Sequence, residues 1–338
     1  MSWSRVRTFT DPWPCQVALQ SVAQAEILPT AKGGFYTETI QIGMNKLRMQ
    51  SFNMVLPQTG TIVIASDRKV IGFLVEPSTS NMQHNGLEVA PHEIFVCGHD
   101  IMHQRSAFNF RCGTMSLPAK DFPVLCRTII GREFLEGSRT SIVRPRSTLM
   151  SRLLNLHMTV RRLARDTADL LEQPEICRAL EEQLIHAMVR CLAEGAGVEP
   201  TMVSCRHGAM MLRFEEFLEA NPERPLYLTE ICAAIGTSER TLRAACEEHL
   251  GMGPIRFLTL RRMHLVRQAL LRADLSRTTV TRIVTDYGFW ELGRFSVAYR
   301  ARFGESPSET LRRPAEHVVI DLNRPSSLSA AEPPRHVN

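Results

Sequence analysis

The chain has 338 residues, 44% hydrophobic and 22% charged, which excludes a disordered or fibrous protein and leaves room for two or three domains. No apolar run reaches the roughly 18 residues of a membrane span, and no apolar stretch of the secretory type follows the N-terminus, so we expect a cytoplasmic protein without membrane contact. The formal net charge is +5, and 36 of the 40 basic side chains are arginine, the residue best suited to phosphate and base edges.

Residues 1–145 contain short β-type runs separated by Gly, Pro, Asn and Asp. The runs are QSFNMVL (50–56), GTIVIAS (60–66), KVIGFLVE (69–76), HEIFVC (92–97) and FNFRC (108–112). They predict a small β-sandwich or barrel. Its apolar side chains fill a core or line a ligand cavity. The candidate lining residues are Phe52, Met54, Ile64, Phe73, Phe95, Phe108 and Phe110.

Residues 146–200 change to a helical period, with apolar side chains three or four positions apart. The stripes are Leu149, Leu153, Leu156, Val160, Leu163 and Leu170, then, after Pro174, Ile176, Leu180, Leu184, Met188 and Leu192. Two amphipathic helices are predicted. Such stripes suit packing within a domain and equally an interface between two subunits.

Residues 207–316 read as a compact helical block that begins with a helix-turn-helix unit. Gly236 can adopt the left-handed conformation that ends a helix, and Ser238 can then cap the next one. No Ser-like capping residue stands before Leu228, where the sequence has Tyr227, so that helix start lacks a side-chain cap.

The same pattern recurs about fifty residues later. Thr279 can cap a helix and Gly288 can turn the chain, while Pro254 opens a long helix that connects the two units. A capping box at Ser306 and Glu309 starts a last short helix. Residues 254–316 hold 12 Arg against 6 Asp and Glu, so this block carries the positive charge and points to a polyanionic partner.

The phrases GTSERTL (236–242), GMGPIRFLTLRR (251–262) and YGFWELGRFSVAYRARFGESPSETLRR (287–313) resemble the DNA-binding domain of the AraC/XylS transcription regulators. The resemblance covers roughly residues 208–313. It implies two helix-turn-helix units on one face of B-DNA, with recognition helices in successive major grooves about 34 Å apart. Small residues usual in that family are replaced by Cys232 and Val284, and a usual aromatic by Cys246, so looser packing of the first unit is expected.

Carried over by position, the resemblance implies two sets of DNA-contacting side chains. Arginine can read guanine, glutamate can accept from cytosine, and small apolar side chains can touch a thymine methyl group. The candidates are Ser238, Glu239, Arg240, Arg243 and Ala244 in the first unit, and Trp290, Glu291, Gly293, Arg294 and Val297 in the second. Candidates for phosphate contacts are Arg256, Arg261, Arg262 and Arg300.

The family resemblance further implies a β-rich, often cupin-like, sensor or dimerisation domain in front. Histidines gather there, namely His84, His92, His99 and His103, together with Glu93. Their spacing lacks the metal-cupin pattern of two histidines one residue apart followed by a carboxylate, so we expect no metal and no cofactor. The nine cysteines form no C-x-x-C pair, and no hydrolase or phosphate-loop motif occurs, so we expect no catalytic residue.

The fold predicted is therefore multidomain α+β: a cupin-like sensor (1–145), a helical dimerisation or linker segment (146–200), an all-α double helix-turn-helix domain (207–316) and a disordered tail (317–338). The protein is predicted to be a promoter-binding regulator that activates transcription in response to an unknown small molecule. We expect it to be a homodimer and to contact RNA polymerase. Two alternatives stay open. One is a regulator without a ligand, whose front domain only dimerises or binds a protein, and the other is a cupin-type metalloenzyme with a DNA-binding tail.

Overall fold

The computed structural model describes residues 2–20, 23–65, 67–75, 82–98, 101–131, 140–198, 202–221, 226–313 and 319–321. Its strands form two antiparallel sheets. The nine-stranded sheet has the order β13 (Ala196–Val198), β12 (Ser141–Arg144), β9 (Ile94–Val96), β6 (Arg68–Leu74), β11 (Phe110–Pro118), β4 (Arg48–Met54), β3 (Thr37–Gly43), β1 (Trp3–Phe9) and β14 (Val319–Asp321). The five-stranded sheet has the order β2 (Ala23–Pro29), β5 (Gln58–Ile64), β10 (Met102–Ser106), β7 (Met82–His84) and β8 (Leu87–Val89).

The nine-stranded sheet is buried on both faces, and strand β11 shows why. Successive side chains of a strand point to opposite faces. Met115 and Leu117 belong to one hydrophobic cluster, whereas Phe110 and Cys112 belong to another. The sheet therefore separates two cores.

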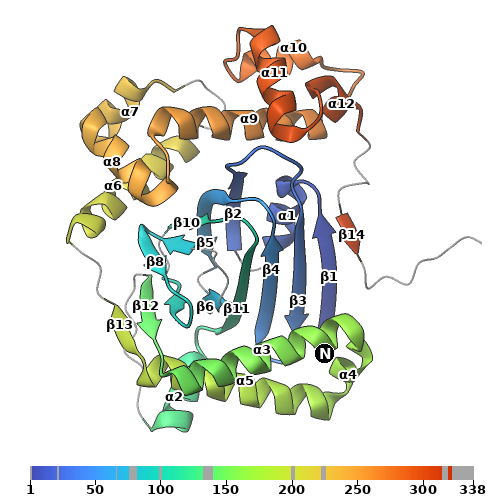
Figure 1. Cartoon of the computed structure of the whole chain (residues 1–338), viewed down its shortest axis with the longest axis vertical. Coiled ribbons are helices and arrows are strands. Elements are labelled where there is room, and N and C mark those ends of the chain that lie inside the picture. The colour runs from blue at the N-terminus through green and yellow to red at the C-terminus, as the bar shows by residue number, and fades with distance from the viewer. Residues whose placement is uncertain are drawn as a thin grey trace, which may run out of the picture.

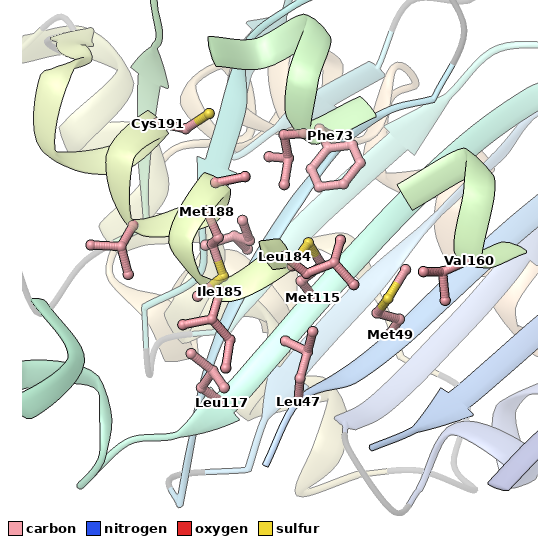
Figure 2. Packing of buried hydrophobic residues seen from close by; sticks show 14 of the residues in the cluster. Leu47, Met49, Phe73, Met115, Leu117, Val160, Leu184, Ile185, Met188 and Cys191 are labelled. Atoms are coloured by element: carbon pink, nitrogen blue, oxygen red, sulfur yellow. The ribbon is translucent and has the colours of Figure 1, made fainter. Parts of the chain in front are cut away.

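Helices cover the first face of this sheet. They are α2 (Phe122–Ile130), α3 (Ser147–Asp166), α4 (Ala168–Glu172) and α5 (Pro174–Glu194). Figure 2 shows Leu184, Ile185 and Met188 of α5 packed against Met115 and Leu117 of β11. The predicted segment 146–200 thus shares its core with the sheet. Its last residues form β13, which pairs with β12, the strand just before the segment.

The second face of the nine-stranded sheet meets the five-stranded sheet and helix α1 (Pro12–Leu19). Asp11 caps α1 by accepting a hydrogen bond from the backbone amide of Trp13 at 3.0 Å. Cys15 and Leu19 of this helix join the core between the sheets. The β-rich prediction is confirmed as two facing sheets, while the likeness to a cupin stays a prediction.

The C-terminal helices gather at the end of the molecule opposite α3 and α5 (Figure 1). They are α6 (Met202–Glu219), α7 (Leu228–Ile235), α8 (Glu239–Leu250), α9 (Pro254–Arg272), α10 (Val280–Asp286), α11 (Leu292–Phe303) and α12 (Pro307–Arg312). Within the region predicted as a disordered tail, residues 319–321 form β14 and pair with β1. The remainder of that tail lies outside the described residues.

Candidate nucleic-acid interface

The first helix-turn-helix unit consists of α7, a glycine turn and α8. Gly236 has a φ of +68°, and the amide of Thr237 donates to the carbonyl of Cys232 at 3.0 Å. Ser238 then accepts a hydrogen bond from the amide of Thr241 at 3.2 Å, which caps α8. Helix α7 begins at Tyr227 without a side-chain cap, as the sequence predicted.

The second unit repeats this arrangement with α10 and α11. Thr279 caps α10 by accepting from the amide of Arg282 at 3.2 Å, and Gly288 turns the chain at a φ of +78°. Behind α11, the capping box of Ser306 and Glu309 starts α12. Both units therefore have the local geometry that the sequence predicted.

Helix α9 joins the two units. Its first half, with Phe257 and Leu260, packs in the core of the first unit, and its second half, with Val266 and Leu270, packs in that of the second. Its 19 residues rise about 28 Å at 1.5 Å per residue. One rigid element thus fixes the separation of α8 and α11.

All ten residues predicted to contact DNA bases are exposed: Ser238, Glu239, Arg240, Arg243, Ala244, Trp290, Glu291, Gly293, Arg294 and Val297. Trp290 and Val297 leave 76% and 72% of their surfaces exposed, unusual values for large apolar residues. Arg294 pairs with Glu291 at 2.8 Å, but both side chains are mostly exposed, so the pair competes weakly with a DNA contact. Base reading by these residues stays a prediction.

The four predicted phosphate contacts divide into two kinds. Arg256 is exposed, and Arg300 is exposed with Glu309 at 3.5 Å. Arg261, in contrast, donates to Glu26 of β2 at 2.9 Å, and Arg262 lies 5.2 Å from the ring centroid of Phe289, where burial lowers its pKa. The guanidinium groups of Arg261 and Arg262 therefore have partners inside the protein. The sequence did not predict the partner of Arg261, because Glu26 is 235 positions away.

The two cysteines of the first unit are buried in its core. Cys232 and Cys246 are buried in one cluster with Phe214 of α6 and Phe257 of α9, whose ring centroids lie 6.1 Å apart. Burial raises the pKa of the Cys246 thiol, which therefore stays protonated. Helix α6 begins at 202, before the predicted start of the block at 207, and its Phe214 packs in the same cluster as the two cysteines. The expectation of looser packing stays a prediction.

The helical block contacts the sheets through buried polar groups. Arg267 of α9 forms an ion pair with Asp11, the cap of α1, with side chains only 5% and 1% exposed. His103 of β10 lies 3.3 Å from Glu215 of α6, again with both side chains buried. Arg302 of α11 donates to the carbonyl of Pro29 at 3.2 Å. These contacts join α6, α9 and α11 to the sheet layer.

A cavity of about 90 Å³ lies between the two sheets. Of the seven predicted lining residues, five line it, namely Phe52, Met54, Ile64, Phe95 and Phe110. The other two do not line it. Successive side chains of a strand alternate between its two faces, and Phe73 lies on the face that packs against α3 and α5. Phe108 is 57% exposed and lies in a turn.

Polar groups converge on this apolar cavity. His84 is 1% exposed, its ring lies 3.9 Å from that of Phe95, and burial lowers its pKa to about 3, so it is neutral. Among the described residues neither ring nitrogen of His84 has a partner, and the same holds for Gln58 Oε1 and Thr59 Oγ1. Glu26 also lines the cavity while it pairs with Arg261.

The remaining histidines do not gather. His92 stands in a turn at a φ of +71°, His103 faces the helical block, and His99 lies outside the described residues. Glu93 binds Arg144 at 2.6 Å rather than a histidine. Within the described part of the chain, no three His, Cys, Asp or Glu side chains are placed to hold a metal ion.

Comparison with known proteins matches residues 231–313 to a helix-turn-helix domain family. A probable thc operon regulatory protein of Rhodococcus erythropolis is 40% identical over 97 residues, which are 29% of this chain and 29% of that protein. The XylDLEGF operon transcriptional activator 2 of Pseudomonas putida is 36% identical over 118 residues, 35% of this chain but 74% of its own length. The chain belongs to the AraC/XylS family of transcription regulators.

The AraC/XylS likeness is concentrated in the helical block. Among solved structures, the AraC-like transcriptional activator CuxR is similar over 78% of this chain and 94% of its own, at 16% identity and a TM-score of 0.41, values that carry no inference about function. The match to the Rhodococcus protein spans less than a third of that protein's length. No helix in the described ranges combines the length and apolar character needed to cross a membrane.

Proposed function

We propose that this AraC/XylS protein is a sequence-specific transcription regulator whose helices α8 and α11 enter successive major grooves of promoter DNA. The observation that carries the proposal is one helix, α9, with a capped helix-turn-helix unit packed on each half. Exposed arginines on the recognition helices, Arg240, Arg243 and Arg294, supply donors for base edges. Arg256 and Arg300 supply phosphate contacts.

Footprinting of the full chain on the DNA upstream of its own gene tests this function. We expect two protected patches on one face of the duplex, separated by one helical turn, or about 10 base pairs. Binding should weaken steeply as salt rises because counterions are released from the phosphates. Absence of protection at every ionic strength would reject the function.

We further propose that a small, mainly apolar effector binds in the cavity between the sheets and regulates activation. His84, Gln58 and Thr59 offer it hydrogen-bonding groups without other partners in the described residues. Glu26 touches both the cavity and Arg261 of α9, and helix α1 lines the cavity through Leu19 while its cap Asp11 pairs with Arg267. An effector that distorts either contact shifts the population between two placements of the helical block.

Thermal unfolding with a library of small aromatic and aliphatic compounds distinguishes this reading from a ligand-independent regulator. A true effector should raise the Tm of the unchanged chain, and His84→Phe should reduce that rise because it removes the polar group and fills the cavity. If no compound in a broad library shifts the Tm, the front domain only dimerises or binds a protein. Stoichiometric iron, zinc or manganese in the purified protein would instead favour the metalloenzyme alternative.

As partners we propose a second copy of the chain, bound through α3 and α5, and RNA polymerase. The two helices lie side by side at the end of the molecule away from α8 and α11 (Figure 1), which leaves the recognition helices of both copies free for DNA. Leu170, at the end of the predicted stripe, is 37% exposed. Sedimentation equilibrium tests the dimer, and a chain that stays monomeric at micromolar concentration would reject it.

A further inference from the structure

A groove of about 480 Å³ separates the five-stranded sheet from the turn between α8 and α9. Figure 1 shows this turn near β10 and β5. The sheet side contributes chiefly Gln83, Arg105 and Ser106, and the helical side contributes Met252 and Arg256. Among the residues that the structure describes, none that lines the groove is acidic. The groove is thus distinct from the enclosed cavity between the sheets and carries two positive charges.

The two arginines that face this groove have no counter-charge. Within the described residues, neither the side chain of Arg105 nor that of Arg256 forms an ion pair or a hydrogen bond. Arg105 lies directly against Gly251, where a Cβ would overlap its guanidinium group, and the φ of +72° at Gly251 also favours glycine. The positive charge of Arg256 also lowers the pKa of Arg302, an effect second to burial. Two unbalanced cations, one from each domain, therefore converge here.

Neutral donors and an acceptor complete the groove. Ser106 is only 4% exposed, and its hydroxyl has no partner in the described part of the chain. Helix α9 begins at the groove with Gly253 as its cap, so its first turn has neither a capping side chain nor an acidic residue. The start of this 19-residue helix is electropositive, and Arg256 of its first turn lines the groove. The carboxamide oxygen of Gln83 is a buried acceptor without a partner.

We propose that this groove binds a small organic phosphate, specifically a phosphate monoester that carries a hydroxyl group. The dianionic head matches the two charges of Arg105 and Arg256, and phosphate oxygens accept from the guanidinium groups and from the Ser106 hydroxyl. A ligand hydroxyl donates to Gln83. The volume suits a small ligand with room for a modest apolar body against Leu250 and Met252.

Such a ligand bridges the sheet layer and the DNA-binding block, so it favours the arrangement in which the two are docked. It also occupies Arg256, a residue predicted to contact a DNA phosphate. A metabolite of this class would thereby oppose DNA binding without entering the apolar cavity. This inference stands on the groove alone and does not require the proposed effector cavity.

Isothermal titration of the full chain with glycerol 3-phosphate tests the site, with inorganic phosphate and sodium chloride at equal ionic strength as further arms. We expect saturable binding of glycerol 3-phosphate, weaker binding of inorganic phosphate, and none with chloride. Arg105→Gln and Ser106→Ala should each weaken binding, the former by about tenfold or more because a charge-assisted pair is lost. The matched control Arg5→Gln, at an exposed arginine on β1, should change nothing.

The exposed Arg256 provides a second variant that decides the question if Arg105→Gln does not fold. Three results would overturn the proposal: no saturable binding, equal affinity in the groove variants, or an Arg105→Gln chain that loses DNA affinity but keeps phosphate affinity. The last result would assign the groove to the DNA interface. A chain that binds the phosphate but never binds DNA would instead reject the proposed function and leave this site standing.

Discussion

Arg240 and Arg243 lie one turn apart on the exposed side of α8, on a helix whose start is fixed by Ser238. If either reads a guanine, replacement by alanine removes a bidentate contact and costs about 1–3 kcal/mol on the specific site. We expect Arg240→Ala and Arg243→Ala to lower specific affinity and relax the preference at one base pair. Fluorescence anisotropy with the protected sequence and with random DNA measures both effects.

Arg5→Ala serves as the control for these variants because it removes the same charge from an exposed site on β1. It should leave the ratio of specific to random affinity unchanged. Equal weakening of Arg240→Ala on both DNAs, together with a smaller salt slope, would show that Arg240 contacts a phosphate instead of a base.

His157 of α3 is fully buried beside Phe73, and burial lowers its pKa to about 4. The unfolded value is about 6.5, so both states are neutral above that pH and the stability is fully present. As the pH falls from about 6.5 towards 4, only the unfolded chain takes up the proton, and stability is lost at about 1.4 kcal/mol per pH unit. His157→Leu should therefore lose about 2 kcal/mol less between pH 7 and pH 5 than the unchanged chain.

Urea unfolding at the two pH values measures this difference independently of any constant cost of the substitution. His186 on α5 carries no such burial, so His186→Leu is the matched control and should keep the full pH dependence. An identical pH dependence in the unchanged chain and in His157→Leu would contradict a neutral buried His157.

The residues that sequence reasoning placed correctly are those whose role is local. Ser238, Thr279 and Ser306 cap their helices because each needs only a backbone amide two or three positions away. Arg261 shows the limit. On the sequence it is one more arginine of a basic block, and only the fold brings Glu26 within 2.9 Å of it.

Among the elements, α7 is one of the helices whose start lacks a side-chain cap. Tyr227 at its N-cap is 71% exposed and already extended, so an acceptor can replace it without strain. Tyr227→Asp should stabilise the chain by about 1 kcal/mol, because its carboxylate satisfies an orphan amide and favours the helix dipole. Thr279→Ala should destabilise it by about the same amount at α10.

Differential scanning calorimetry of both variants measures these effects, and Tyr227→Ala is the control that removes the ring without adding an acceptor. Stabilisation by alanine equal to that by aspartate would mean that loss of the tyrosine, and not capping, is the cause. A Thr279→Ala chain of unchanged Tm would show that its hydroxyl contributes nothing to α10.

The sequence periodicity predicted the helices of residues 146–200, but not which side chains lie at the centre of their contact with the sheet. The helical stripe of 146–200 predicted α3 and α5, yet Leu149, Leu156 and Leu163 lie at the edge of the contact. Its centre is formed by residues such as Leu153, His157 and Val160. Strands β1 and β3 were missed because polar residues interrupt TETIQIG and WSRVRTF, and burial of these strands depends on sheet neighbours far away in the sequence.

At the scale of the whole molecule, the sequence predicted which parts exist and not how they meet. The double helix-turn-helix followed from glycines and caps, whereas the pairing of β12 with β13 across 50 intervening residues did not. Docking of the helical block on the sheets depends on single long-range pairs, such as His103 with Glu215. No sequence period encodes such pairs, so the groove at β10 and the link through Glu26 become visible only in the fold.

The buried ion pair between Asp11 and Arg267 should hold the two layers together, and a double-mutant cycle measures it. Asp11→Asn keeps the acceptor that caps α1 but leaves Arg267 with Glu305, at 2.8 Å, as its remaining carboxylate partner in the described residues. Breaking a buried pair from one side costs about 3 kcal/mol. Arg267→Met should cost at least as much, because it leaves the buried Asp11 without its basic partner, whereas Glu305 keeps Arg313. The double variant should cost less than the sum of the two, by about 1–3 kcal/mol, in urea unfolding at pH 7.

The same cycle between Asp11→Asn and the distant, 80% exposed Arg178→Met should be additive. Additivity in both cycles would show that this pair does not couple the sheet layer to the DNA-binding block.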